Sequence, residues 1–257
     1  MSKVLITGCR NGIALDVACR LLKRGHTVYA TVHRAVSVND VRAALRSYGE
    51  DFVVDSLDIT KPSDIDKVDN WDVDVLVNNA AIGDSGPLAE IDLRRIAATF
   101  DTNVFSALRL TQKVIPKLIE NGRGRIIFMG SMAGTVPTPF YAPYGMTKFA
   151  LESVASSLRT ELKPFGIKVI IINPGVYRTG FNESFMSRKY EWMDAQSLYK
   201  DHMAYVRRAD WVMKLGLPST WSIARQVVRA VEARWPRRRY IAPAWEWVFL
   251  PIFRWFG

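Results

Sequence analysis

The stretch KVLITGCRNGIA, residues 3–14, joins an apolar run to a glycine-containing loop and then to the start of a helical pattern. Gly8 permits a tight turn after the apolar run, and Gly12 lets the backbone approach a pyrophosphate at a helix N-terminus. A glycine pattern alone is weak evidence, but its place between a first strand and a first helix strengthens it. The stretch predicts a strand–loop–helix unit that binds a dinucleotide.

Further along the chain, strand-like and helix-like segments alternate. Apolar runs rich in Val and Ile occur at 3–7, 27–32, 51–56, 73–79, 124–131 and 167–174. Helical patterns fall between them, at 13–23, 41–48, 93–119 and 145–162. The runs barely alternate, which is typical of strands buried on both faces of a parallel sheet. We therefore expect an α/β fold: a doubly wound parallel sheet (Rossmann fold) in a three-layer α/β/α arrangement, as a single domain over residues 1–257.

Composition narrows the class of protein. The chain has 257 residues, of which 49% are hydrophobic, so we expect it to bury a large core rather than to be disordered. Cys9 and Cys19 are close together and are expected to be reduced, buried thiols of a cytoplasmic protein. The N-terminal MSKVLITG runs straight into a strand, so we expect no signal peptide.

The net charge of +10 is unevenly spread. Residues 225–257 carry seven arginines and two glutamates, so they hold half of that charge. Such a balance favours an anionic ligand, anionic lipid or nucleic acid. No nucleic-acid motif accompanies it, so nucleic acid is the least favoured partner. We also expect no metal site.

Residues 181–222 interleave aromatic residues and methionines with charges. One interpretation is a substrate-loop insertion that covers a site, because Met and aromatic side chains adapt to apolar ligands. The other is a pair of ordinary amphipathic helices packed on the sheet. The sequence leaves both open.

The C-terminal tail, residues 243–257, is apolar and rich in Trp and Phe. A membrane-spanning helix needs about 20 apolar residues, and Pro251 interrupts this shorter segment. The tail could pack at a subunit interface, form a wall of the substrate pocket, or enter a membrane surface beside Arg237, Arg238 and Arg239. Our hypothesis is peripheral association with a membrane.

Polar residues follow the expected strands where each one ends: Asp58, the NNAA stretch at 78–81, Ser131 and the NPG stretch at 173–175. Open α/β sheets bind ligands at the carboxyl ends of their strands. The next helix begins with Tyr144 and Lys148, which at i and i+4 share a face. Lysine and the helix N-terminus both favour a phenolate, so this pattern predicts a Tyr144 pKa lowered toward an acid/base range.

The chain resembles the classical short-chain dehydrogenase/reductase (SDR) family over about residues 3–242. The resemblance depends on TGCRNGIA for TGxxxGxG, NNAA for NNAG, a Ser 13 positions before YxxxK, and PGVYRT, residues 174–179, for PGxxxT. Ala14 and Ala81 stand where the family has glycine, and we expect tighter packing there rather than lost binding.

The resemblance implies a catalytic set. Tyr144 would be the general acid that protonates a carbonyl oxygen, and the base in the reverse direction. Lys148 would lower the Tyr144 pKa and hold the nicotinamide ribose. Ser131 would hold the substrate oxygen, with a simple strand-end turn as the alternative. Asn103 would kink a long helix and hold a water for proton relay, with a capping or surface amide as the alternative.

The cofactor is expected to be NADP(H) rather than NAD(H). No acidic residue that could select NAD follows the second strand. His33, Arg34 and Arg10 could instead meet a 2′-phosphate, although Arg34 could be merely solvated. By resemblance, Asp58 contacts the adenine amino group, or it caps the following turn, and Thr179 binds the carboxamide. The expected cofactor-binding residues are Gly8, Arg10, Asn11, Gly12, Ile13, His33, Arg34, Asp58, Ile59, Asn79, Ala80, Ala81, Tyr144, Lys148, Pro174, Gly175, Val176 and Thr179.

The expected function is an NADP(H)-dependent carbonyl reductase or alcohol dehydrogenase. Its substrate would be apolar: steroid-like, retinoid-like, long-chain acyl or a xenobiotic ketone. Two alternatives are a catalytically silent dinucleotide-binding sensor or scaffold, and a lipid-binding protein at a membrane surface. We expect a homodimer or homotetramer, with residues 93–119 and 145–162 as a dimer face.

Overall fold

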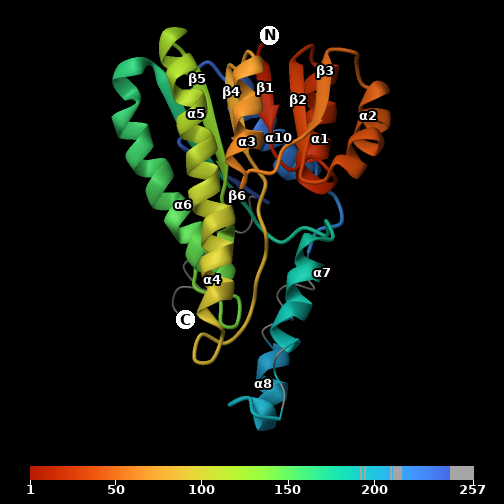
Figure 1. The fold of residues 1–257 in the computed structure, drawn as a ribbon, viewed down its shortest axis with the longest axis vertical. Coiled ribbons are helices and arrows are strands. Elements are labelled where there is room, and N and C mark those ends of the chain that lie inside the picture. The colour runs from red at the N-terminus through yellow and green to blue at the C-terminus, as the bar shows by residue number, and fades with distance from the viewer. Residues whose placement is uncertain (192, 194, 209, 211–215, 244–257) are drawn as a thin grey trace.

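Parallel strands form the centre of the computed structural model (Figure 1), which describes residues 1–191, 193, 195–208, 210 and 216–243. The strands are β1 (Lys3–Ile6), β2 (Thr27–Val32), β3 (Phe52–Ser56), β4 (Val75–Asn78), β5 (Gly124–Met129), β6 (Ile167–Pro174) and β7 (Arg239–Ala242). Their order is β3-β2-β1-β4-β5-β6-β7, and each neighbouring pair is parallel. The order reverses direction between β1 and β4, so the expected doubly wound sheet is confirmed.

Helices cover both faces of the sheet (Figure 1). The α-helices of the described residues, including two that lie away from the sheet (α7 and α8), are α1 (Gly12–Lys23), α2 (Val38–Arg46), α3 (Pro62–Ile65), α4 (Leu93–Phe100), α5 (Ala107–Glu120), α6 (Ala142–Glu161), α7 (Phe181–Met186), α8 (Met203–Arg208) and α10 (Trp221–Glu232). Val4 and Ile6 of β1 belong to the core under α1, α2 and α10, whereas Leu5 belongs to the core under α5 and α6. Successive residues of one strand thus serve two cores, because side chains alternate between the faces of a sheet. The three-layer, single-domain expectation is confirmed.

The segment expected as one helix over residues 93–119 is two helices. Between α4 and α5, Asp101–Ser106 form a π-helical segment (η3). Asn103 lies in it, accepts a hydrogen bond from the Ile82 N–H at 2.8 Å and donates one to the Ile82 carbonyl at 2.8 Å. The π-helical segment, which is wider than an α-helix, therefore lies where Asn103 bonds the loop that contains Ile82.

The chain beyond residue 180 departs from the sheet. Figure 1 shows α7 leading away from the sheet and α8 at the end of the molecule that lies opposite the N-terminus. The two do not pack on a sheet face, so this arrangement favours the covering-segment interpretation of residues 181–222. None of the helices in the described part of the chain is long and apolar enough to cross a membrane.

Candidate active site

A cavity of about 900 Å³ opens at the carboxyl ends of the strands. Loops that follow β1 to β6 all contribute to it, as the strand-end pattern predicted. The expected site residues that line it are Gly8, Asn11, Gly12, Ile13, His33, Asp58, Ile59, Asn79, Ala80, Ala81, Ser131, Tyr144, Lys148, Pro174, Gly175, Val176 and Thr179. Arg10, Arg34 and Asn103 are not among the lining residues.

The glycine loop has the shape that a bound dinucleotide requires. Gly8 and Gly12 adopt φ angles of +74° and +63°, which favour glycine. A Cβ on Gly8 would lie 3.1 Å from Ala80 Cα, and one on Gly12 would lie 3.1 Å from Thr179 Cβ. Asn11, the N-cap of α1, makes no side-chain capping bond, which leaves N–H groups of the first turn for another acceptor. The residues present therefore fit a pyrophosphate at this helix N-terminus.

Thr7, which the sequence analysis did not single out, ties this loop to the next strand. Its hydroxyl oxygen accepts hydrogen bonds from the N–H groups of Asn79 at 3.0 Å and Ala80 at 2.9 Å. The Asn79 side chain donates to the Thr7 carbonyl at 2.9 Å. These bonds hold the NNAA stretch against the glycine loop.

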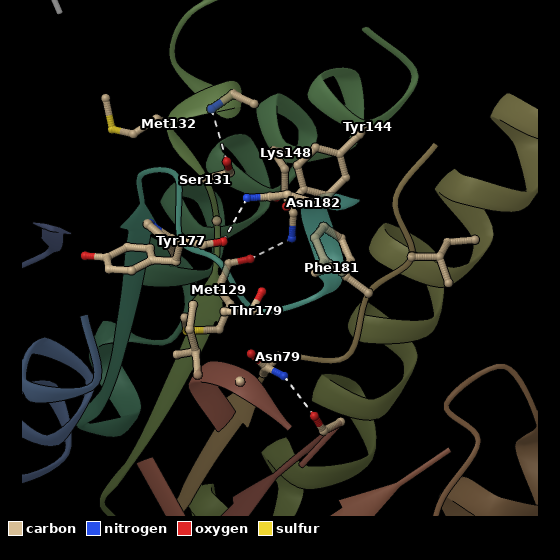
Figure 2. A pocket seen from close by; sticks show the side chains of 18 of the residues that line it. Asn79, Met129, Ser131, Met132, Tyr144, Lys148, Tyr177, Thr179, Phe181 and Asn182 are labelled. Carbon is tan, nitrogen blue, oxygen red and sulfur yellow. Dashed lines mark hydrogen bonds between the residues drawn. The ribbon is translucent and has the colours of Figure 1, made fainter. Parts of the chain in front are cut away.

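Tyr144 and Lys148 lie on one face of α6, as their spacing predicted. Both are buried, and the Lys148 ammonium lies 5.3 Å from the centroid of the Tyr144 ring. The ammonium donates a hydrogen bond to the Met129 carbonyl at 2.7 Å (Figure 2). The last residue of β5 therefore holds the lysine beside the phenol.

The electrostatics of this pair differ from the expectation. Burial lowers the pKa of Lys148 to about 7. Burial also raises the pKa of Tyr144 above its ordinary value, although its hydrogen bond with Ser131 acts in the opposite direction. The prediction of a lowered Tyr144 pKa is wrong, because desolvation outweighs the hydrogen bond with Ser131. The phenol is therefore protonated at neutral pH.

Ser131 lies where it can hold a substrate oxygen, and it also forms the strand-end turn that was the alternative. It lines the cavity and caps the short turn after β5, where its hydroxyl accepts a hydrogen bond from the Ala133 N–H at 3.1 Å. Asn103 is 1% exposed and does not line the cavity. Its side-chain amide also donates a hydrogen bond to the Thr147 hydroxyl at 3.1 Å. That hydroxyl donates to the Tyr144 carbonyl at 2.7 Å. Asn103 thus connects the loop after β4 to the helix that carries Tyr144.

The corner near the end of β2 holds the residues expected to select the cofactor. The Cys9 N–H donates to the Thr31 carbonyl at 2.7 Å, which brings the loop with Arg10 next to the residues that follow β2. His33 lines the cavity and lies 3.3 Å from an Asp58 carboxylate oxygen. Asp58 also accepts hydrogen bonds from Thr60 at 3.0 and 2.7 Å, so it stabilises the following turn as well as lining the cavity.

The far end of the cavity has an apolar wall, most of which the sequence analysis missed. It is lined by Val136, Pro137, Pro139, Phe140, Phe181 and Tyr205. The aromatic composition of residues 181–222 was the signal for the last two. The proline-rich TVPTPF at 135–140 could have signalled the others.

Fold and site together define an α/β protein of the dinucleotide-binding class, with a buried tyrosine–lysine pair in its cavity. The family model described as short chain dehydrogenase matches residues 2–189, and the chain belongs to this family. It is therefore an NAD(P)-dependent oxidoreductase that acts on alcohol or carbonyl groups.

Named relatives and solved structures agree with this assignment. The chain is 30% identical to human 17-beta-hydroxysteroid dehydrogenase type 1, over 98% of this chain and 79% of that protein. It is 29% identical to retinol dehydrogenase 8 of Bos taurus, over 92% of this chain and 80% of that one. The structure matches a short-chain dehydrogenase from Streptomyces avermitilis with a TM-score of 0.81 and 25% identity, over 97% of this chain and 90% of that one.

The sequence also led to expectations for the two cysteines and for the C-terminal tail. Cys9 is buried and its pKa is raised by burial to about 12, but Cys19 is only partly buried. The aromatic tail falls almost entirely on residues 244–257, which lie outside the described residues.

Proposed function

We propose that the protein reduces apolar ketones with NADPH and, in reverse, oxidises the corresponding secondary alcohols. The observation that carries the proposal is a single cavity that runs from the glycine loop, past Ser131, Tyr144 and Lys148, to the apolar wall. The proton donor therefore lies between the dinucleotide site and the apolar substrate site. A carbonyl reduction needs this arrangement, because the carbonyl must meet both the cofactor and the proton donor.

The chain's own groups have separate roles in this proposal. Tyr144 carries its proton at neutral pH, as a phenol with an ordinary or raised pKa does, so it can donate that proton to a carbonyl oxygen. The Ser131 hydroxyl holds that oxygen, and Asn103 fixes the helix that carries the phenol. Lys148, kept in place by the Met129 carbonyl, holds the ribose of the cofactor. NADPH, when bound, supplies the hydride.

The preference for NADP(H) follows from the charges beside β2. No carboxylate follows the strand, and Arg10 and Arg34 are exposed on two loops that the Cys9–Thr31 bond holds together. An arginine fork can donate two hydrogen bonds to a phosphate. These cations support recognition of a 2′-phosphate, with His33 on the cavity wall.

The apolar class of substrate is supported by the wall of Phe140, Phe181 and Tyr205, and by relatives named for a steroid and for retinol. Phe140 packs edge-on against Tyr199 and Tyr205, with ring centroids 5.4 and 5.8 Å apart. Aromatic walls of this kind suit flat, bulky apolar molecules.

Members of the family are generally oligomeric and act on small substrates. We propose a homodimer here, paired through α4, α5 and α6. Exposed apolar side chains on α4, on α6 and on the π-helical segment between α4 and α5 support it: Leu93, Met146, Phe149 and Phe105. A cytoplasmic location is supported by the free thiols of Cys9 and Cys19.

Replacing Tyr144 with Phe tests the proposal. The variant keeps the ring but loses the proton donor, so we expect kcat for a bulky ketone to fall by about 10²–10⁴-fold. Fluorescence titration should show NADPH binding close to wild type and NADH binding more weakly than NADPH. Tyr205→Phe, another tyrosine of the cavity, is the matched control and should lose far less activity.

Other outcomes would separate the alternatives. Full activity in Tyr144→Phe would contradict the assigned acid. NADPH binding without turnover of any ketone by the wild-type chain would favour a sensor or scaffold. No change in nicotinamide fluorescence would favour a lipid-binding protein, and tighter binding of NADH would reverse the cofactor assignment.

A further inference from the structure

Basic residues concentrate at the edge of the sheet opposite the cavity. The segments 121–125, 163–169 and 233–239 lead into β5, β6 and β7, which are neighbours in the sheet. Together they contain eight lysines and arginines and no acidic residue, in a chain whose net charge is +10. The eight are Arg123, Arg125, Lys163, Lys168, Arg234, Arg237, Arg238 and Arg239. We call these three segments the basic edge.

Contacts hold the three segments together as one surface. The Arg125 guanidinium donates to the carbonyls of Ala230 at 2.6 Å and Ala233 at 2.7 Å, which ties β5 to the end of α10. A Cβ on Gly166 would lie 2.6 Å from the Gly122 carbonyl oxygen, so the first two segments are in contact. The Lys168 ammonium lies 6.0 Å from the Trp235 ring centroid, which joins the second segment to the third.

Most of these charges are unneutralised. Arg239 pairs with Glu152 at 2.5 Å, and Arg125 is occupied by the two carbonyls. The other six are exposed, and none forms an ion pair with an acidic residue of the described part of the chain: Arg123, Lys163, Lys168, Arg234, Arg237 and Arg238. Asp72 and Asp74 share a surface pocket with Arg123, but Asp72 pairs with the Lys3 ammonium and Asp74 accepts a hydrogen bond from the Lys3 N–H. A cluster of cations of this kind favours a positive potential over its face of the molecule.

Two aromatic side chains protrude from the same surface. Trp235 is 76% exposed and Phe165 is 44% exposed. Cations flank the Trp235 ring, with the Arg234 guanidinium 5.8 Å from its centroid in addition to Lys168. Trp and Phe among Lys and Arg are the side chains that a membrane–water interface favours.

We propose that the basic edge binds the surface of membranes that contain anionic phospholipids. A second copy of this chain fits the surface poorly, because it would bring like charges together. Nucleic acid fits less well because cations already contact the Trp235 ring on which a base would stack. The basic edge is formed by described residues alone, so the proposal does not depend on the C-terminal tail or on the proposed reaction.

The arrangement has a consequence for access to the site. The basic edge lies at the amino ends of the strands, at the end of the molecule where the N-terminus lies, and α7 and α8 lie at the other end (Figure 1). A chain bound by its basic edge keeps the cavity directed away from the lipid headgroups, open to cofactor from solvent.

Vesicle co-sedimentation of the full chain tests the proposal. We expect binding to phosphatidylcholine vesicles that contain about one third phosphatidylserine, weakened by high salt, and none to phosphatidylcholine alone. Arg237→Gln with Arg238→Gln should weaken this binding about 30-fold, since each basic residue near an anionic surface adds about fivefold. The matched control, Arg46→Gln with Lys200→Gln, removes two exposed basic residues elsewhere and should bind like wild type.

Tryptophan quenching by brominated lipid locates the contact. Trp235→Phe should reduce the quenching, whereas Trp221→Phe, at the other end of α10 and 50% exposed, should not. Equal binding to neutral vesicles, equal loss in the two double variants, or tighter binding to duplex DNA at the same salt would each overturn the proposal. NADPH titration of the same variants should match wild type, so failure here is distinguishable from failure of the dinucleotide site.

Discussion

Lys148 shows how burial alters a residue whose type and position are readable from the sequence. Its spacing from Tyr144 predicts a shared helix face, and the structure confirms it. Its pKa of about 7 is not readable, because it follows from burial under segments that are distant in the chain. An unfolded lysine keeps a pKa of about 10.4.

This difference predicts a pH dependence of stability. Between pH 7 and pH 10 the unfolded chain binds a proton at Lys148 that the folded chain has largely released, so protons favour unfolding there. The free energy of unfolding should therefore rise with pH in this window, by up to about 3 kcal/mol from this group. In Lys148→Met the same rise should be much smaller.

Urea unfolding at several pH values between 6 and 10 measures the effect, with the Met variant subtracted from wild type to remove other titrating groups. Lys113→Met, which replaces a partly exposed lysine paired with Asp66 and Asp69, is the control and should leave the slope unchanged. A wild-type slope equal to that of Lys148→Met would show that Lys148 keeps its proton throughout.

The positions of the catalytic candidates were the most predictable part of the site. The rule that ligands bind at the carboxyl ends of parallel strands predicts that Asp58, Ser131 and the NNAA stretch meet at one site, and Asp58, Ser131 and residues 79–81 line one cavity. The Tyr144 pKa was predicted in the wrong direction. A local pattern shows which charges are near in sequence, but it does not show how much solvent the folded chain removes.

Elements with local signals were predicted, and elements made by distant contacts were not. The runs that became β1 to β6 are apolar and rich in Val and Ile. β7, Arg239–Ala242, has four residues and begins with an arginine, so it has little strand signal of its own. It forms because it pairs with β6 from Ile171 to Pro174. The π-helical segment at Asp101–Ser106 likewise depends on Ile82, about twenty residues upstream.

A buried polar cluster attaches the segment that carries Lys189, Tyr190 and Asp210 to the loop before α6. Asp210 accepts hydrogen bonds from the hydroxyls of Tyr141 and Tyr190, each at 2.5 Å, and pairs with the fully buried Lys189 ammonium. Tyr141 lies immediately before α6 and next to Phe140 of the cavity wall. The cluster thus links residues 187–210 to the loop that leads to Tyr144.

Removing Asp210 should release this segment while the sheet stays folded. Asp210→Ala leaves the Lys189 ammonium buried without a counter-charge, which costs about 3 kcal/mol. Hydrogen exchange of residues 187–208 should speed up by about 100-fold, with β4 and β5 unchanged. KM for a bulky ketone should rise more than kcat falls.

Asp201→Ala is the matched control, because Asp201 is an exposed acid of the same segment. Adding Lys189→Met to Asp210→Ala should restore much of the protection, since an apolar pair avoids the unpaired charge. Exchange that speeds up equally in both single variants would contradict a clamping role for the cluster.

At the scale of the whole molecule, parallel topology separates two surfaces. Every strand begins at one edge of the sheet and ends at the other, so the loops that enter the strands and those that leave them form opposite faces. The sequence shows both the excess of arginine and the polar strand ends. Their separation follows from the parallel direction of the strands, which the sequence predicts, but the order β5-β6-β7 that brings the three basic segments together is not readable from it.

Exposed apolar side chains on α6 and between α4 and α5 predict how copies of the chain assemble. Met146 and Phe149 of α6 are 38% and 41% exposed, and Phe105 between α4 and α5 is 55% exposed. α4 and the π-helical segment both pack beside α6, so these side chains can form one apolar face. Exposed apolar faces of this kind indicate an interface between chains.

Phe149→Glu should convert the proposed dimer to a monomer, because a two-fold interface would bury two copies of the carboxylate, each without a partner. Light scattering after gel filtration gives the mass, and circular dichroism should show the helices intact. Phe165→Glu changes the same residue type at 44% exposure, compared with 41% for Phe149, but lies outside α4 to α6, so the dimer should persist. A dimer in both variants would place the contact elsewhere, and a wild-type monomer at micromolar concentration would leave this apolar face without a partner copy.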